Sequence, residues 1–83
     1  MKVLYFAWLR QRIGHAEDAI ELPKGVDDVR GLIEHLKRQG PGYATALADL
    51  STVRVAVNHE YVGFDHRLQK SDEIALFPPV TGG

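Results

Sequence analysis

The 83-residue chain contains no cysteine. Without thiols it can form no disulfide framework, thiolate zinc site or catalytic cysteine, and it cannot hold sulfur as a side-chain persulfide. Its four histidines, His15, His35, His59 and His66, lack the i, i+4 spacing that places two ligands on one helical face. We therefore expect no metal site.

Neither sign of charge is in clear excess, and long apolar runs are missing. The 10 Lys and Arg nearly balance the 11 Asp and Glu, so nucleic acid is not an expected partner. The longest uncharged apolar run, residues 3–9, is far too short to span a membrane. Lys2 followed by a strand-like stretch lacks the layout of a signal peptide. We expect a cytoplasmic protein that does not bind a membrane.

The length indicates one domain with a single core. A chain of this size leaves roughly a third of the surface of its unfolded state exposed, so an elaborate enclosed active site is not expected. No repeat, linker or low-complexity segment interrupts the sequence.

Segments rich in β-branched and aromatic residues predict the strands. The first is "KVLYFAWL", and Gly14 lies in the turn after it. Asn58 and His59 can form the turn before a short strand, because Asn tolerates left-handed geometry. The expected strands cover residues 2–9, 18–22, 53–58, the surroundings of 61–62, and 72–77.

One amphipathic helix is predicted in the middle of the chain. Asp27 offers an N-cap side chain. The helix should end near Gly40 and Pro41, and residues 43–50 should hold a short helical turn or a loop. Its apolar stripe, at i, i+3, i+4 and i+7, consists of Val29, Leu32, Ile33 and Leu36.

This order of elements predicts an α+β roll, in which one main helix lies across one face of a mixed sheet. A strand over residues 2–9 would be apolar on both faces, and one helix cannot cover both. The alternatives are that loops fold over the second face, or that its residues are scattered surface hydrophobes; an uncovered set would mark a protein interface. The expected faces are Val3, Tyr5, Ala7 and Leu9 on one side and Leu4, Phe6 and Trp8 on the other.

The stretch "FPPVTGG", residues 77–83, is not explained by packing. Two adjacent glycines bury no apolar surface, and they lose the most backbone entropy on ordering. Pro78 and Pro79 fix their own φ angles and withhold two amide donors, so they end sheet pairing. We expect a domain over residues 1–77 and an extended, flexible tail over residues 78–83.

Three stretches give the chain a resemblance to the β-grasp ubiquitin-like proteins, and to the small subunit of molybdopterin synthase in particular. They are "KVLYFAWLR", "GVDDVRGLIEHL" and "VAVNHEYVGFDHRLQKSDEIALFPPVTGG", and together they cover essentially the whole chain. The most specific part is "VN" followed by "DEIALFPPVTGG". One departure is Ser71, where the family commonly has glycine, and this should alter only a turn.

The resemblance implies that the chain carries sulfur at its carboxyl terminus. Gly83 would be adenylated with ATP by an adenylyltransferase of the ubiquitin-activating type and converted to a thiocarboxylate, a C-terminal 1-thioglycine. The large subunit of molybdopterin synthase would receive the tail, in a heterotetramer of two small and two large subunits, and would supply the catalytic groups. This chain would bind no cofactor and would not be catalytic alone.

The resemblance also implies a set of site residues. Gly82 and Gly83 would enter a narrow channel, and the partner would contact an apolar docking surface and the root of the tail. Each aromatic in this set could instead be an ordinary half-buried sheet residue. The expected partner-binding residues are Phe6, Tyr61, Phe77, Pro78, Pro79, Val80 and Thr81.

Other functions remain open from the sequence. The same terminus would serve a sulfur carrier for thiazole synthesis or tRNA thiolation, although "PPVTGG" argues against it. A protein modifier would form an isopeptide bond to lysine, and a pure interaction module would tolerate loss of Gly83. A catalytic triad around His59 or His66 is not expected, because no serine or cysteine nucleophile is aligned with them.

Overall fold

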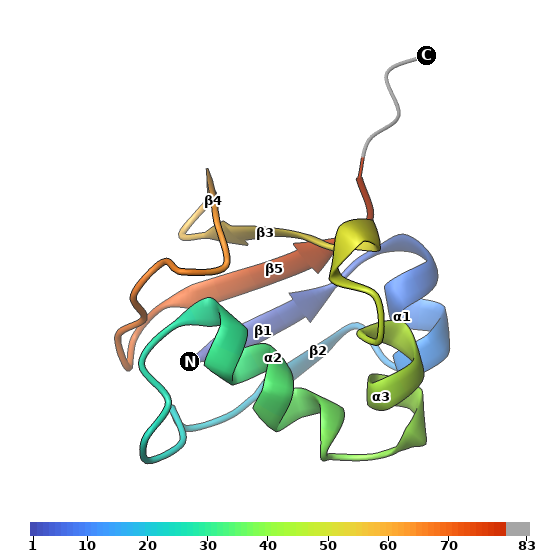
Figure 1. The fold of residues 1–83 in the computed structure, drawn as a ribbon, viewed down its shortest axis with the longest axis horizontal. Helices are drawn as coiled ribbons and strands as arrows, with labels where there is room; N and C mark the ends of the chain where they lie inside the picture. Colours follow the sequence, from blue (N-terminus) through green and yellow to red (C-terminus); the bar gives the residue numbers. More distant parts are fainter. Residues whose placement is uncertain (80–83) are drawn as a thin grey trace.

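The computed structural model describes residues 1–79, which form one five-stranded sheet with helices packed on it (Figure 1). Val80, Thr81, Gly82 and Gly83 lie outside the described residues. In chain order the elements are β1 (Lys2–Tyr5), α1 (Ala7–Ile13), β2 (Glu17–Ala19), α2 (Val29–Lys37), α3 (Pro41–Ala46), the 3-10 helix η1 (Leu50–Thr52), β3 (Arg54–Val57), β4 (Glu60–Val62) and β5 (Glu73–Phe77).

The sheet has the strand order β2-β1-β5-β3-β4. β1 and β5 are parallel neighbours in its centre, and the remaining pairs are antiparallel. Alternation along β5 buries Ile74 and Leu76 fully and leaves Ala75 and Phe77 half-buried. The core therefore lies on one face of the sheet, where α2 crosses the strands, and the mixed sheet with its main helix confirms the expected α+β roll (Figure 1).

The first strand is shorter than predicted, because the chain leaves the sheet after Tyr5. The expectation of a strand over residues 2–9 is wrong from Phe6 onward: Ala7 has φ 54° and the helix α1 follows. Leu9 is fully buried from the helix, which ends at the left-handed Gly14. The apolar density of "FAWL" was compatible with either element, and Leu9 and Ile13 at i, i+4 with a glycine C-cap were the helical signal.

The helix α2 shows the expected apolar stripe, but its N-cap differs by one residue. Asp28, not Asp27, accepts the backbone N–H of Gly31 through its side chain at 2.8 Å. Asp27 instead pairs with Arg67 at 2.8 Å, and its carbonyl accepts the N–H of Leu68. The loop before β5 is thereby fastened to the start of α2. Four stripe residues are buried, Val29, Leu32, Ile33 and Leu36.

The remaining boundaries shift by a few residues. The second strand is β2, three residues long, in place of residues 18–22. The region 43–50, expected to hold a short helical turn or a loop, contains the last four residues of α3 and the first residue of η1; α3 begins with Pro41 as its first helical residue. β3, β4 and β5 occupy the expected places. Among residues 1–79, no helix has the length and apolar character needed to cross a membrane.

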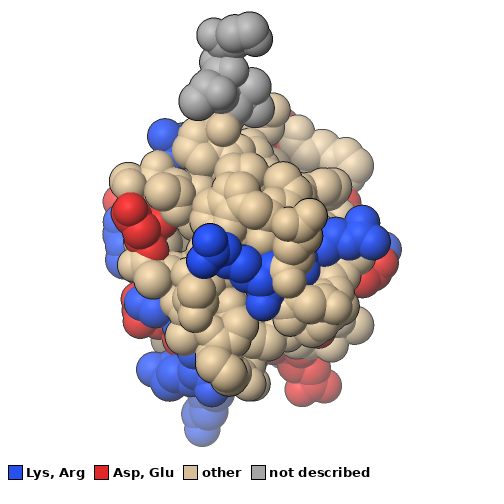
Figure 2. All heavy atoms as spheres, turned by 90° about the vertical axis from the view of Figure 1, so that its right-hand side faces the viewer, with Lys and Arg blue, Asp and Glu red and all other residues tan. Residues whose placement is uncertain are grey.

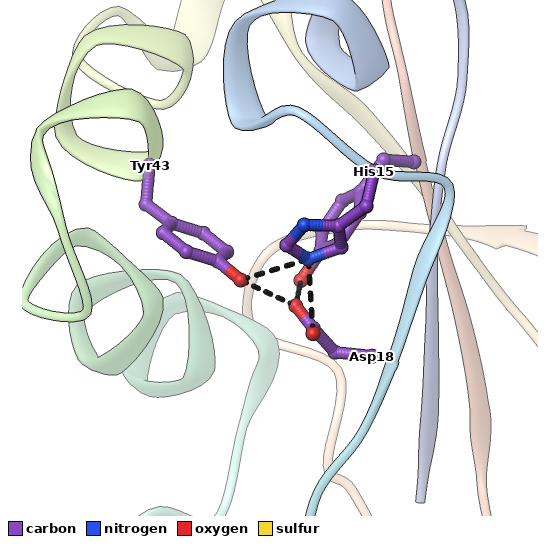
Figure 3. Close-up of polar contacts among 4 residues, drawn as sticks. His15, Asp18 and Tyr43 are labelled. Atoms are coloured by element: carbon purple, nitrogen blue, oxygen red, sulfur yellow. Dashed lines mark hydrogen bonds and ion pairs between the residues drawn. The ribbon is translucent and has the colours of Figure 1, made fainter.

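A polar cluster ties α3 to the edge of the sheet (Figure 3). Asp18 Oδ2 accepts the hydroxyls of Tyr5 at 2.8 Å and Tyr43 at 2.6 Å, and Asp18 Oδ1 lies 2.9 Å from His15 Nε2. The three aromatic rings meet edge to face, with centroids 5.9 to 6.1 Å apart. One carboxylate thus holds together β1, β2 and α3, whose helix is too short to be stable alone.

The cluster shifts the pKa values of its members. Partial burial opposes ionisation of Asp18, but hydrogen bonds from Tyr43, His15 and Tyr5 prevail and lower its pKa below the usual value of an aspartate. Burial, followed by the hydrogen bond to Asp18, raises the pKa of Tyr43 to about 12, and the same causes raise the pKa of Tyr5 above its usual value. Asp18 is therefore the acceptor and the tyrosines are the donors at neutral pH.

Asp18→Asn should lower the free energy of unfolding by about 1 to 3 kcal/mol at pH 7, because the tyrosine hydroxyls lose a charged acceptor. A depressed folded-state pKa stabilises the protein above the unfolded value of about 3.9, and this contribution disappears as pH falls through the lowered pKa. Denaturant unfolding of both proteins between pH 2.5 and 7 should show the difference shrinking only at the acid end.

Glu17→Gln is the matched control, because Glu17 is the preceding residue and forms only an exposed pair with Lys2 at 3.5 Å. It should change stability by less than about 1 kcal/mol at pH 7. A loss of stability for Asp18→Asn that is no greater than that of Glu17→Gln would show that the cluster does not hold α3.

Candidate functional site

An open groove lies on the sheet face opposite α2. Its volume is about 320 Å³. β1, β3, β4 and β5 all contribute to it, and it carries the two large hydrophobic residues that are exposed among the described residues, Phe6 at 47% and Tyr61 at 81%. The residues of this open-face groove are Leu4, Phe6, Ala56, His59, Tyr61, Glu73, Ala75 and Phe77.

Strand register explains the shape of the groove. Leu4 pairs with Ala75, Ala75 with Ala56, and Ala56 with Tyr61, so these four side chains form one row across four strands. The two alanines in the middle are small and make a floor. Tyr61 and Phe77 form a wall, with ring centroids 5.5 Å apart and planes at 41°. A row with a low centre and aromatic sides fits a protruding apolar side chain of a partner.

The far end of the groove is polar. His59 Nε2 lies 2.7 Å from Glu73 Oε2, and His59 and Asn58 both have positive φ in the β3–β4 turn. The side chain of Asn58 accepts the N–H of Glu73 and donates to Asp72, while Asp72 also accepts the N–H of Gln69. Asp72 is 8% exposed and serves the turn, whereas Glu73 faces the groove. The two neighbouring acids therefore do not form one site.

The groove adjoins the root of the C-terminal segment. β5 ends at Phe77, and Pro78 and Pro79 follow as half-buried residues outside the sheet. The N–H of Phe6 donates to the carbonyl of Leu76 at 3.1 Å, which fastens the start of α1 to the end of the strand β5, just before the prolines. Phe6 and Phe77 are thus held at the place where the chain leaves the sheet. The reactive glycines predicted from the sequence, Gly82 and Gly83, lie beyond the described residues.

The structure brings together several of the predicted site residues and separates from them Trp8, a residue expected on the same strand face as Phe6. Phe6, Tyr61 and Phe77 line one groove, with the prolines at its end. Trp8, expected on the same face as Phe6, lies on α1 and lines a different hollow with Arg12 and Asp49. That residue was misplaced because the strand prediction ran through the start of α1.

Sequence reasoning missed the floor and the polar end of the groove. Ala56 and Ala75 carry no chemical signal, but their alternation with buried residues on adjacent strands could have placed them on one face. His59 and Glu73 are 14 positions apart, and only the pairing of β3 with β5 brings them together. Within residues 1–79, no three potential metal ligands cluster.

The comparisons with known proteins cover the whole chain. The molybdopterin synthase sulfur carrier subunit of Escherichia coli is 43% identical over 83 residues, which are 100% of this chain and 99% of that protein. The subunit of the same name from Haemophilus influenzae is 39% identical over 83 residues, with the same coverage. Small archaeal modifier protein 1 of Methanosarcina acetivorans has a solved structure with a TM-score of 0.71 at 27% identity, over 99% of this chain and 94% of that one.

The strand order and the helix across the sheet are those of a β-grasp protein, in agreement with the structural similarity to small archaeal modifier protein 1. The ThiS family model matches residues 3–83, so the match includes the open-face groove and extends through the two terminal glycines. The chain belongs to the ThiS family.

Proposed function

We propose that this chain is the sulfur carrier subunit of a molybdopterin synthase and that it carries the sulfur on the C-terminal carboxyl group of Gly83. The observation that carries the proposal is the 43% identity to the Escherichia coli subunit, which extends over all 83 residues and therefore includes "FPPVTGG". The open-face groove beside Pro78 supports it, since a docking surface next to the tail would hold the tail in one direction.

The chemistry requires a carboxylate, which is ionised at neutral pH. A carboxylate oxygen of Gly83 attacks the α-phosphorus of ATP bound to an adenylyltransferase of the ubiquitin-activating type, and pyrophosphate leaves. A sulfide equivalent then attacks the acyl carbon and AMP leaves, so that one oxygen is replaced by sulfur. The product is a thiocarboxylate, and no cysteine of this chain is needed.

The thiocarboxylate would act in the large subunit of the synthase. There the sulfur would form a bond to a carbon of the cyclic pyranopterin monophosphate precursor while a carbon–oxygen bond at that carbon breaks. Water would then cleave the acyl–sulfur bond of the resulting thioester, which leaves the sulfur on the precursor and regenerates the carboxylate of Gly83. Two such transfers, from two charged carriers in turn, would build the dithiolene of molybdopterin. We expect the acid and base groups for these steps on the large subunit and two copies of each subunit in the assembly.

The tail is suited to entering a channel. Six residues from Pro78 span at most about 20 Å, which is enough to reach a buried pocket while the folded domain docks outside. The prolines keep φ near −65° and stiffen the exit. Glycine at positions 82 and 83 removes the Cβ that would clash with channel walls close to the reacting carbon.

A second candidate is a protein modifier, because the chain also resembles small archaeal modifier protein 1 at 27% identity. A modifier would form an isopeptide bond between Gly83 and a lysine of another protein. A blot for conjugates in cells expressing a tagged chain separates the two functions. A carrier for thiazole synthesis or tRNA thiolation would be separated by supplying the respective acceptor in place of the pterin precursor.

Deletion of Gly83 should reduce molybdopterin formation by at least about 100-fold. It moves the reacting carboxylate by one residue, roughly 3.3 to 3.6 Å, and displacements near 1 Å can already cost that much. Among the residues that the structure describes, the buried core ends at Leu76, so the melting temperature should change by no more than about 4 °C. The assay contains ATP, the adenylyltransferase, a sulfide source, the large subunit and the precursor.

Gly82→Val should give nearly the same loss of activity, because the stiff, branched side chain of valine would clash with the walls of the narrow channel. Gly63→Ala is the matched control: a Cβ there meets nothing within 4 Å, and activity should be retained. Normal product formation by the chain that lacks Gly83 would rule out the terminal sulfur carrier.

Phe6→Asp and Tyr61→Asp should each weaken binding to the large subunit by about 30-fold, equivalent to about 2 kcal/mol, because the partner would have to bury an unpaired charge. Both side chains are exposed, so folding should be retained. Phe6 is the N-cap of α1, a position that Asp favours. Isothermal titration calorimetry measures the dissociation constants, and thermal unfolding checks the fold.

Ala19→Asp is the control for this pair, since Ala19 is exposed on the edge strand β2, at the opposite edge of the sheet from β4. It should leave the affinity unchanged. Equal affinities for Phe6→Asp, Tyr61→Asp and the natural chain would remove the open-face groove from the docking surface.

A further inference from the structure

The charged side chains are distributed unevenly over the protein. The segments 6–13 and 41–54 contain three arginines, Arg10, Arg12 and Arg54, and one acid, Asp49. The other parts of the chain contain the remaining seven Lys and Arg and the remaining ten Asp and Glu. A chain with a formal net charge of −1 thus has a locally cationic part, which we call the arginine end.

The two segments lie side by side in the fold. α1 packs so closely on α3 that a Cβ on Gly42 would come within 2.6 Å of the carbonyl oxygen of Arg12. Trp8 and Arg12 of α1 line a hollow with Asp49 and Thr52, which precede β3. Figure 2, which faces this end, shows Lys and Arg within a largely uncharged surface, with Asp and Glu toward its margins.

The arginine end borders both the groove and the root of the tail. Arg54 pairs with Phe77 in the sheet register, and it lies on the same face as Ala56, two residues further along β3. Arg10 is an exposed residue of α1, whose N-cap is Phe6. Arg54 therefore lies beside Phe77, and Arg10 belongs to the helix that begins after Phe6, the two aromatic residues that are held where the chain leaves the sheet.

These cations differ in their surroundings from the four Lys and Arg residues that form ion pairs. Lys2, Arg30, Lys37 and Arg67 each pair with an acidic side chain. Among residues 1–79, no acidic side chain lies within ion-pairing distance of the three arginines at the arginine end. The guanidinium of Arg12 stacks over Trp8 at 5.2 Å.

The side chain of Arg54 is held in place by hydrogen bonds to nearby backbone carbonyls. Its Nη1 donates to the carbonyls of Ser51 at 3.3 Å and Val53 at 3.0 Å. Arginines in the last turn of α1 also complement the helix dipole, but this accounts only for Arg10 and Arg12. A positioned arginine on β3, beside the docking groove, needs a different explanation.

We propose that the arginine end is a steering surface that fits an acidic protein surface at the entrance of the channel receiving the tail. The inference rests on the proposed function, because it takes the large subunit as the protein that provides this entrance. Complementary charges around the tail root accelerate association and orient the domain so that residues 78–83 point into the channel. The groove then provides apolar contact, and the arginines provide direction and rate.

The test is the association rate of the natural chain with the large subunit from the same organism, measured by stopped flow between 20 and 500 mM NaCl. The rate should fall by about tenfold or more as salt increases, since screening removes steering. Arg10→Gln with Arg54→Gln should lower the low-salt rate by a similar factor and flatten the salt dependence. Should that pair unfold in a thermal melt, Arg10→Gln with Arg12→Gln replaces it.

Lys24→Gln with Arg38→Gln is the matched control. It removes the same two charges from exposed positions before α2 and at its C-cap, so rate and salt dependence should match those of the natural chain. Equal slowing by both pairs would mean that only net charge matters and would overturn the proposal. The arginine variants are also tested for binding to a labelled DNA duplex. If they lose a DNA affinity that the natural chain has, while their association with the large subunit is unchanged, the arginines bind a polyanion instead, and the proposal is overturned.

The two proposals fail differently. A rate that is independent of salt, together with normal molybdopterin formation by the natural chain, would refute steering and leave the sulfur carrier intact. Salt-dependent association without any product from the natural chain would support the steering surface and refute the proposed chemistry.

Discussion

The parallel pairing of β1 with β5 is the constraint on which the rest of the structure depends. It joins the first and last strands in the centre of the sheet and makes both run toward the same end. The two segments that follow these strands, α1 and the C-terminal segment, must therefore leave the sheet side by side. The hydrogen bond from Phe6 N–H to the carbonyl of Leu76 fixes this arrangement, and it places an exposed aromatic residue and the proline root together.

The same pairing separates stability from function. Within residues 1–79, every buried core residue lies between Val3 and Leu76, and the helices cover one sheet face. The opposite face is left with Leu4, Ala56 and Ala75 as a shallow floor between aromatic walls, a surface that the protein does not need for its own core. In the proposed function the folded domain supplies a docking surface and a direction, and the reaction takes place on residues beyond it.

The sequence predicted the sheet and the main helix to the extent that local patterns decide them, whereas Phe6, Tyr61 and Phe77 were expected at a docking surface because of the family resemblance. The apolar stripe from Val29 to Leu36 predicts the helix α2, and the alternation in β5 predicts which of its side chains face the core. The boundary after Tyr5 could not be read from apolar density, because "FAWL" suits a strand and a buried helix equally well. Three contacts join segments that are distant in the sequence, so no local pattern could have predicted them. They are His59 with Glu73, Arg54 with Phe77, and Asp18 with Tyr43.

The central claim is that sulfur is carried on the carboxyl group of Gly83, and the mass of the C-terminal peptide from native cells tests it most directly. Cells in which the large subunit is inactivated should accumulate the charged carrier. The account predicts a C-terminal peptide whose mass is increased by the replacement of one oxygen with sulfur, and the loss of this form when the adenylyltransferase is deleted. A peptide that carries only the ordinary carboxylate in both strains would contradict the account.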